Sequence, residues 1–474
     1  LIASYHDADV AYAVFDNHKR GDYKPYILKT QDRGNSWKLM VQGLPERGAA
    51  HTIIEDHIDP DLLFAGTEYG LYFSNDGGDN WHELTSLPTI AVRDLEIQRR
   101  EVDLVIGTFG RGIYILDDYA PLRTSSADLE AEATLFTVRD AFLYNPDDRR
   151  GWGGKGDWGA GRYTADNPPY GAVFAYYLPA DLQSIKEQRR EAEQERAAEG
   201  DDNPYPSWEQ LRREDREEAP SMTLTVRDSK GKVVQRIDGP ADKGFHHVAW
   251  DMRYPAPDPI NLEESTDLAP WESPPRGPMA LPGTYTVTLS KRVEGELMDI
   301  MGSQIFTLKP LYSGGLVTEN RQDVLNFQMQ TAELYRAVAG ANEAAGEIQN
   351  RIDHLVAAVE ATPAASEEQA QVVRILNARM QDLQVMLNGD SAVSNRAEPV
   401  PMSITTRVGN IVDGSWSSQA AVTGNYRDSY AIAAQQFPEV LEELKSIFAD
   451  LSRLEQELQS EGAPWTPGRI PDWP

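Results

Sequence analysis

The feature that most constrains the fold is a short motif that occurs twice in the first quarter of the chain. Both copies fit the pattern Ser/Thr-x-Asp-x-Gly-x-x-Trp: Thr30-Gln31-Asp32-Arg33-Gly34-Asn35-Ser36-Trp37, and then Ser74-Asn75-Asp76-Gly77-Gly78-Asp79-Asn80-Trp81. A second repeat has nearly the same period as the first, because the segment 61–72 is repeated at 103–114 with its Gly-Thr pair and its final Tyr. A period of about 40 residues with several short apolar strands per unit predicts blades of a β-propeller.

Each residue of the motif has a local structural role. The Asp carboxylate can accept backbone N–H groups of its own turn, the Gly allows a backbone conformation closed to other residues, and the Trp packs between sheets. The alternative, that Asp32 and Asp76 are catalytic carboxylates, is not needed to account for either residue. We therefore interpret the motif as structural, with both tryptophans buried and both carboxylates bound to backbone amides. The structural set is Thr30, Asp32, Gly34, Trp37, Ser74, Asp76, Gly78 and Trp81.

The motif resembles the Asp box, or BNR repeat, of sialidases, sortilin-type receptors and two-propeller xyloglucan hydrolases. Two boxes in register with a second repeat make a strong marker of propeller blades. They are a weak marker of activity, because a fold does not fix a function.

Residues 1–122 are expected to supply three blades. Strands are predicted near 2–3, 10–15, 26–30 and from 37, then at 52–55, 62–66, 71–74 and from 81, and finally at 92–97, 104–107 and 113–116. The third unit has neither an Asp box nor a fourth strand. Three blades cannot close a ring, and open edges invite pairing. We therefore expect the remaining blades in a segment that precedes Leu1 or in another chain, with a strand from there pairing along 113–116.

Composition excludes several classes of partner and site. The 474 residues carry a formal net charge of −30, so nothing in the chain would neutralise the phosphates of a nucleic acid. There is no cysteine, which excludes disulfides and thiolate metal sites. No apolar run reaches about 18 residues, the length that a membrane-spanning helix needs, so no membrane insertion is expected.

The middle of the chain predicts a linker followed by a sandwich of strands. Residues 123–170, rich in Gly, Trp, Asp and Pro, are interpreted as a linker, because a phosphate-binding glycine loop would need a flanking strand and helix. Residues 171–310 contain several apolar strands, interrupted near 181–219 by a stretch of mixed charge. That stretch predicts a solvated helical insertion or, alternatively, an arm that binds a partner. The set Asp228-x-x-Gly231, Trp250-Asp251 and Leu281–Val287 resembles the Ig-like domain of flagellar hook-capping proteins.

The last third is predicted to be helical. Apolar residues recur at helical spacing in three stripes, which favours an antiparallel bundle over 311–462 with a core of its own rather than a docking face. The segment 463–474, rich in Pro and Trp, is expected to be an extended tail.

The order of parts resembles the C-terminal half of large bacterial sortilin-like or glycosyl-hydrolase-like repeat proteins. The resemblance is carried by Asn80-Trp81, Leu87-Pro88-Thr89, Gly110–Asp118 and Pro168–Ala172. It implies a mainly β fold with partial Asp-box propeller blades, an Ig-like β-sandwich and an α-helical C-terminal bundle. It also implies export, to the periplasm or outside the cell.

The same resemblance directs attention to one face of the propeller. Ligands are expected on the side of the B–C loops, which join the second and third strands of each blade, opposite the Asp boxes. The candidate ligand-binding residues in these loops are His18, Lys19, Arg20, Asp22, Tyr23, Glu68, Tyr69, Phe109 and Arg111. For each residue the alternative is a purely structural role, and Gly110-Arg111-Gly112 is also typical of a tight turn.

Catalytic chemistry is only partly available in these loops. A glycosidase needs two carboxylates placed across the scissile bond, and Asp16, Asp22 and Glu68 are the candidates. The arginine triad of a sialidase cannot be completed by Arg20 and Arg111 alone. His246 and His247 are neighbours in a strand and face opposite ways, so they do not share a metal ion. We expect neither a metal nor a cofactor.

Three hypotheses for function remain. The first is an exported, non-catalytic binding or scaffold protein that holds a protein or glycan ligand on the B–C loop face. The second is a glycoside hydrolase whose active site lies mostly on other blades, which two acidic side chains facing each other across a cleft would favour. The third is a subunit of a cell-envelope assembly, which a large apolar contact surface on the helices would favour.

Overall fold

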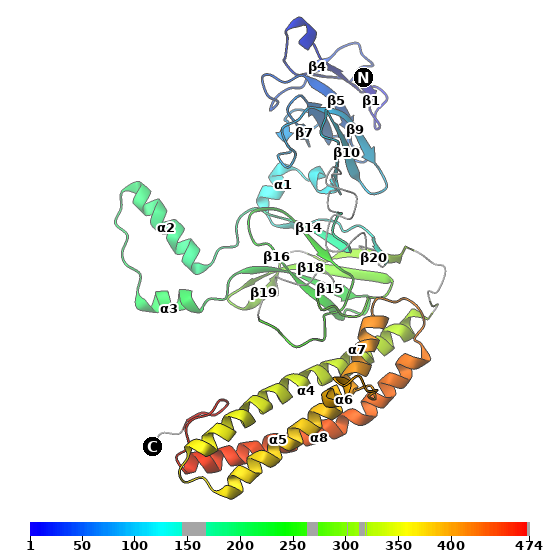
Figure 1. Cartoon of the computed structure of the whole chain (residues 1–474). Coiled ribbons are helices and arrows are strands. Elements are labelled where there is room, and N and C mark those ends of the chain that lie inside the picture. Colours follow the sequence, from blue (N-terminus) through cyan, green and yellow to red (C-terminus); the bar gives the residue numbers. More distant parts are fainter. Residues whose placement is uncertain (145–166, 263–273, 301, 312–317, 319, 472–474) are drawn as a thin grey trace.

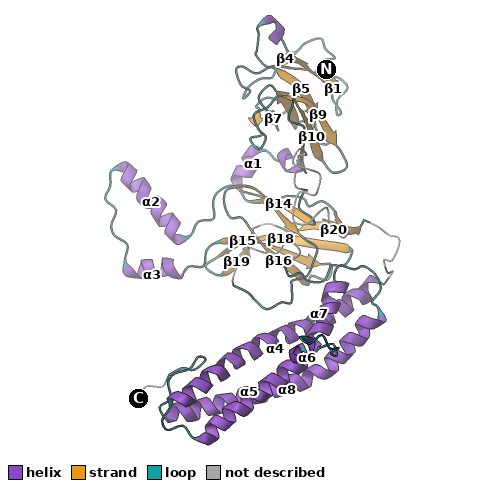
Figure 2. Cartoon of the chain, viewed as in Figure 1, coloured by secondary structure: helices purple, strands orange, loops and turns teal. Residues whose placement is uncertain are grey.

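The computed structural model of the protein describes residues 1–144, 167–262, 274–300, 302–311, 318 and 320–471. The chain runs in order through three small sheets, two further sheets that carry a helical arm, and a set of long helices (Figure 1). Within the described part, helices contribute more residues than strands (Figure 2). The predicted helical C-terminal region is confirmed, and the expectation of a mainly β chain is corrected to a mixed one.

The first region contains three antiparallel sheets. Four strands pair in sequence order in each of the first two sheets, and three strands do so in the third. Most of the predicted strands are present, and the third sheet has no fourth strand among the described residues. The strands are β1 (Ile2–Ala3), β2 (Ala11–Phe15), β3 (Tyr26–Thr30), β4 (Lys38–Leu39), β5 (Ala50–Glu55), β6 (Leu63–Thr67), β7 (Leu71–Ser74), β8 (His82–Glu83), β9 (Val92–Gln98), β10 (Asp103–Thr108) and β11 (Ile113–Leu116).

The middle sheet, β5 to β8, is covered on both sides. One apolar cluster joins it to the first sheet and another joins it to the third. Every residue of β6 is buried, as expected for a strand enclosed between two layers. Gly66 permits the close approach of the third sheet, because a Cβ atom there would lie 2.7 Å from the side chain of Val92.

Both Asp-box turns form the expected hydrogen bonds. Asp32 accepts the backbone N–H of Ser36 at 2.8 Å, and Asp76 accepts that of Asn80 at 2.9 Å. The hydroxyl at the first position of each box accepts the backbone N–H of the box glycine, Gly34 at 2.8 Å and Gly78 at 2.9 Å. Both carboxylates therefore serve their own turns, and the hydrogen bonds lower the pKa of each below its ordinary value against the opposing effect of burial.

The tryptophans of the two boxes differ. Trp81 is 3% exposed, and its indole N–H donates to the backbone oxygen of Met40 at the end of the first sheet. Trp37 is 39% exposed, so the prediction that both are buried is wrong for Trp37. The physical reason is that Trp81 packs on the sheet that precedes its own, whereas no described sheet lies on the corresponding side of the first sheet.

The second region consists of two sheets around one apolar core. One sheet has the order β12-β14-β17, and the other has the order β13-β20-β18-β15-β16 with β19 paired to β18. The only parallel pairing among the described strands is β13 with β20. The strands are β12 (Thr134–Leu135), β13 (Ala141–Leu143), β14 (Ala172–Leu178), β15 (Ser221–Asp228), β16 (Val233–Gly239), β17 (Gly244–Trp250), β18 (Gly283–Val293), β19 (Glu296–Asp299) and β20 (Gln304–Pro310).

The expected linker, 123–170, contributes to these sheets. The 3-10 helix η2 (Ala120–Arg123) and helix α1 (Ser126–Ala131) lead directly into β12. Because β12 pairs with β14 and β13 pairs with β20, the second region begins well before the predicted boundary at 171. The glycine-rich part of the expected linker, 145–166, lies outside the described residues.

A buried ion pair fastens the end of the first region to its middle sheet. Asp56 has a fully buried side chain, and Arg123 donates to it at 2.8 and 3.1 Å. The Tyr119 hydroxyl donates to the same carboxylate at 2.6 Å. Burial alone would raise the pKa of Asp56, but these hydrogen bonds outweigh it and lower the pKa to about 2.

The charged stretch near 181–219 forms two helices, α2 (Ile185–Glu199) and α3 (Trp208–Arg216), which project from the second region as an arm (Figure 1).

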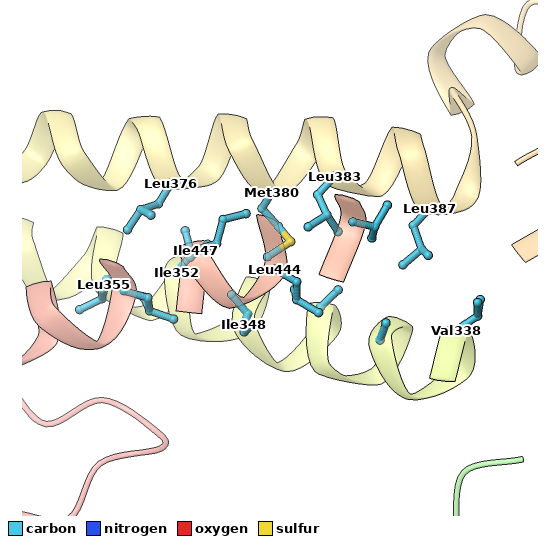
Figure 3. Packing of buried hydrophobic residues seen from close by; sticks show 14 of the residues in the cluster. Val338, Ile348, Ile352, Leu355, Leu376, Met380, Leu383, Leu387, Leu444 and Ile447 are labelled. Atoms are coloured by element: carbon cyan, nitrogen blue, oxygen red, sulfur yellow. The ribbon is translucent and has the colours of Figure 1, made fainter. Parts of the chain in front are cut away.

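The helical region packs around one apolar core. Its three long helices are α4 (Arg321–Ala361), α5 (Glu367–Asn388) and α8 (Gly424–Ser460), with α6 (Ser391–Ser394) and α7 (Ile404–Ser415) between α5 and α8. Residues of the predicted stripes, such as Ile352, Met380 and Ile447, meet in this core (Figure 3). The loop between α4 and α5 is short, so the chain reverses direction there.

The C-terminal segment is not an extended tail in its described part. Arg469 donates to the backbone oxygen of Glu455 at 3.0 Å and to the side chain of Gln459 at 3.2 Å, and Thr466 is buried. The segment folds back on the end of α8 because these contacts and the packing of Ala463 on the core hold it there.

Candidate functional site

A polar cluster joins the three small sheets on the side of the B–C loops. Glu68, in the loop between β6 and β7, accepts a hydrogen bond from Nε2 of His51 at 2.8 Å. Arg93 donates to Nδ1 of His51 at 3.1 Å and lies 3.4 Å from the same Glu68 oxygen. Because a guanidinium group only donates, Nδ1 of His51 is an acceptor. The proton of the ring is therefore on Nε2, which donates the hydrogen bond to Glu68.

His51 and Arg93 occupy equivalent places in the repeat. In β5, Ala50 pairs with Thr67 and Thr52 pairs with Gly66, which leaves His51 as the extra residue of a β-bulge. In β9, Val92 pairs with Thr108 and Asp94 pairs with Gly107, which leaves Arg93 in the same position. Bulges redirect side chains and are frequent beside functional sites. Two neighbouring sheets therefore present one redirected side chain each to the same carboxylate.

The first sheet adds an acid and a second histidine to this cluster. Asp16 follows β2 directly and accepts from the ring of His18, in the 3-10 helix η1 (His18–Arg20), at 2.7 Å. Asp16 also lies 3.8 Å from Nδ1 of His51. Burial would raise the pKa of Asp16, but the hydrogen bonds from the backbone and ring of His18 outweigh it and lower the pKa below its ordinary value.

Two exposed aromatic rings flank the cluster. Phe109, in the loop between β10 and β11, is 68% exposed, and the guanidinium of Arg93 lies 5.4 Å from the centre of its ring. Tyr69 packs on Gly48, where a Cβ atom would approach the tyrosine ring to 2.8 Å. Gly48 has a φ of +141°, so its position favours glycine both for space and for backbone conformation.

A recess of about 780 Å³ adjoins the cluster at the first sheet. Its walls are the B–C loop 21–26 and the segment 44–47, and Gly48 links it to the cluster by donating to the backbone oxygen of Tyr23 at 2.7 Å. The guanidinium of Arg47 lies 5.4 Å from the centre of the Tyr23 ring. Asp22 accepts from the Tyr26 hydroxyl at 2.7 Å and from Asn17 at 3.1 Å, and these bonds lower the pKa of Asp22.

The structure brings together some of the predicted site residues. His18, Glu68, Tyr69 and Phe109 lie in or beside the cluster, and Asp22 and Tyr23 line the recess. Lys19, Arg20 and Arg111 are exposed, and their side chains form no hydrogen bond or ion pair with the described residues. Arg111 lies between Gly110 and Gly112, which have φ values of +86° and +82°, as expected for a tight turn.

Sequence reasoning missed His51, Arg93 and Arg47. A signal for the first two existed, because aligning Asp61-Leu62 with Asp103-Leu104 in the two repeats matches residues 50–52 with residues 92–94. The bulges themselves are visible only in the pairing of the strands. Arg47 carried no signal, because it follows β4 in an irregular segment.

Metal and membrane sites find no support in the described part of the chain. Within it, no group of three or more His, Asp or Glu side chains is placed to hold a metal ion. None of its helices combines the length and the apolar character that crossing a bilayer requires.

No model of a protein family matches the chain, and a search of curated proteins gave no match.

Proposed function

We propose that the protein is a non-catalytic binding or scaffold protein that holds a protein or glycan ligand on the B–C loop side of its three small sheets. The observation that carries this proposal is the cluster of Glu68, His51 and Arg93 beside the exposed rings of Phe109 and Tyr69. Exposed aromatic rings next to fixed donors and acceptors are the chemistry by which proteins hold sugars and peptide side chains. The adjoining recess has a volume within the range typical of ligand sites, about 300–1,000 Å³.

We infer that the three small sheets are consecutive blades of an Asp-box propeller and that the two sheets of the second region are an Ig-like sandwich. The repeated strand order, the Asp-box turns and the packing of Trp81 on the preceding sheet support the first part. Further blades, from another segment of the polypeptide or from another chain, would cover Trp37. A strand pairing with β11 would cover Ile113 and Ile115, which are 72% and 58% exposed. The resemblance to exported bacterial proteins supports a location in the periplasm or outside the cell.

A glycoside hydrolase is the second candidate, because the cluster holds two carboxylates. Asp16 and Glu68 both contact His51, on different ring nitrogens. A glycosidase also needs a carboxylic acid that stays protonated near neutral pH. Hydrogen bonds from His18 lower the pKa of Asp16 and hold it in its ionised form, so Asp16 does not suit this role. This favours binding over catalysis.

Binding can be tested by screening the full chain against arrays of glycans and peptides. Arg93→Ala and Phe109→Ala should each weaken the strongest signals by about tenfold, because each removes a side chain of the proposed ligand face. Arg336→Ala is the matched control, because Arg336 is exposed on α4 and lies outside the first region. Signals that are unchanged in both cluster variants would contradict the proposal. Hydrolysis of chromogenic glycosides that is lost in Glu68→Gln would favour the second candidate instead.

A further inference from the structure

The arm formed by α2 and α3 has no apolar core. None of the residues of α2 is buried, and the only buried residue of α3 is Glu214. The arm projects away from the long helices (Figure 1), and its contact with the sheets includes the ion pair of Arg213 in α3 with Glu294 in the turn between β18 and β19. Burial of apolar surface therefore does not account for its structure, and its function must lie in the surface that it presents.

Ion pairs and caps fix the shape of the arm instead. Arg189 donates to both carboxylate oxygens of Glu214 at 2.7 and 2.8 Å, and to Glu193 at 2.7 Å. Ser184 and Glu187 form a reciprocal cap at the start of α2. Asn203, in the loop between the helices, donates to the backbone oxygen of Glu193 at 2.8 Å. The loop is therefore held in place before any partner binds, which reduces the entropy lost on binding.

The outer loop of the arm, residues 201–209, includes the first two residues of α3 and exposes two large aromatic side chains. Tyr205 is 77% exposed and Trp208 is 70% exposed, and their ring centres lie 6.1 Å apart with the rings tilted towards an edge-to-face arrangement. Pro204 and Pro206 flank Tyr205 and restrict its backbone. Tyr and Trp are the residues most enriched where protein interfaces gain their binding energy. Two of them on a fixed loop form a contact surface with few rotatable bonds.

Acidic side chains outnumber basic ones around these rings. Asp201, Asp202 and Glu209 lie near the aromatic pair in the sequence, and none of them has an ion-pair partner among the described residues. Of the two nearest arginines, Arg212 and Arg213, the second is neutralised by its ion pair with Glu294. A guanidinium or ammonium group can lie on the face of Trp or Tyr while it pairs with a carboxylate, so this combination favours a cationic partner. A second copy of this chain is disfavoured, because each copy carries a net charge of −30.

We propose that the outer loop of the arm, residues 201–209, binds an arginine- or lysine-rich segment of another protein. This surface is separate from the B–C loop side, and the proposal does not depend on any function of that side. Cationic side chains of the partner stack on Tyr205 and Trp208 and pair with Asp201, Asp202 and Glu209.

Fluorescence anisotropy with a labelled oligo-arginine peptide tests this proposal on the full chain. The wild type should bind, and Tyr205→Ala/Trp208→Ala should weaken binding by about tenfold. Trp465→Ala, which removes an exposed aromatic ring from the C-terminal segment, should bind as the wild type does. Because both arm residues are exposed, the thermal unfolding midpoint should not move, which separates lost binding from lost folding.

A charge-matched pair of variants distinguishes the loop from the acidity of the whole chain. Asp201→Asn/Asp202→Asn should weaken binding more than Glu333→Gln/Glu347→Gln, which removes two exposed carboxylates of α4. Equal effects of the two pairs, or wild-type affinity in Tyr205→Ala/Trp208→Ala, would overturn the proposal, and so would no binding by the wild type. A dimer in sedimentation experiments that becomes a monomer in Tyr205→Ala/Trp208→Ala would assign the loop to self-association instead.

Discussion

The turn 74–81 lies against the first sheet, and the turn 30–37 lies on the outer side of that sheet. Within each turn the hydrogen bonds are nearly identical, from hydroxyl to carboxylate and from backbone N–H to carboxylate. Beyond the turn they differ, because Trp81 is enclosed by the preceding sheet and Trp37 is not. The comparison shows that the motif specifies its turn locally, whereas the burial of its tryptophan depends on a neighbouring sheet. The two turns thus provide an internal control for each other.

The largest difference is expected between the two tryptophans, in the stability lost when each is replaced by Ala. Trp81→Ala should destabilise the first region by about 3–5 kcal/mol, because it removes a fully packed ring and leaves a cavity between two sheets. Trp37→Ala should change its stability by about 1 kcal/mol or less, because the ring is largely solvated. Chemical unfolding followed by hydrogen exchange in β6 measures both. Equal losses at the two positions would break the comparison.

The second largest difference is expected between the two box glycines, in the stability lost when each is replaced by Ala. Gly78 has a φ of +96°, and a Cβ atom there would lie 2.6 Å from Sδ of Met40. Gly34 has a φ of +87°, but the nearest atom to its Cβ position is 3.9 Å away. Gly78→Ala combines backbone strain with a clash and should destabilise by about 2–4 kcal/mol, whereas Gly34→Ala should cost only about 1 kcal/mol of strain. Thermal unfolding of the two variants side by side tests this, and a larger loss at Gly34 would contradict it.

Acid should lower the stability of the middle sheet, because that sheet adjoins the buried ion pair of Asp56 with Arg123. The pKa of Asp56 is lowered from 3.8 to about 2 in the folded protein. Its stabilising effect is therefore fully present above about pH 5 and is lost as the pH falls through 3.8 towards 2, with a total of about 2 kcal/mol. Hydrogen exchange in β5 and β6 between pH 6 and pH 3 should show this loss. Arg123→Ala should remove most of the pH dependence, and a wild-type profile in that variant would show that Asp56 is not its source.

The smallest difference is expected at the carboxylates of the two boxes. Asp32→Ala and Asp76→Ala should lower the unfolding midpoint by similar amounts, about 2–4 °C, because the same local hydrogen bonds are lost in both turns. Neither substitution should change ligand binding on the B–C loop side. A loss of binding at an unchanged midpoint would favour a functional role for these carboxylates, against the structural one proposed for them.

The sequence predicted the local structure of the first region well because that structure repeats. The strands and the hydrogen bonds of the Asp-box turns depend on neighbouring residues, and a repeat shows them twice. The helices α4, α5 and α8 were predictable because their apolar residues recur at helical spacing. The strands β12 and β13 were missed because they have only two and three residues and pair with strands far along the chain.

The remaining errors concern contacts between distant segments. The exposure of Trp37 depends on what lies beside the first sheet, and the fold-back of 463–471 depends on Arg469 reaching α8. In the candidate site, Glu68 and Phe109 were predicted from their loops, but His51 and Arg93 meet Glu68 only because both strands bulge at the same step. Neither spacing nor composition carries that information.

The two bulges have a consequence for how such a site can change. A bulged residue takes no part in the regular pairing of its strand, so its side chain can be exchanged with little effect on the sheet. The bulged position holds an imidazole, His51, in β5 and a guanidinium, Arg93, in β9. Both strands keep their regular pairing on either side of the bulge. Each of these two units thus offers one interchangeable position that faces the same carboxylate, Glu68. Ligand preference can therefore evolve one sheet at a time, while the stacking of the sheets stays unchanged.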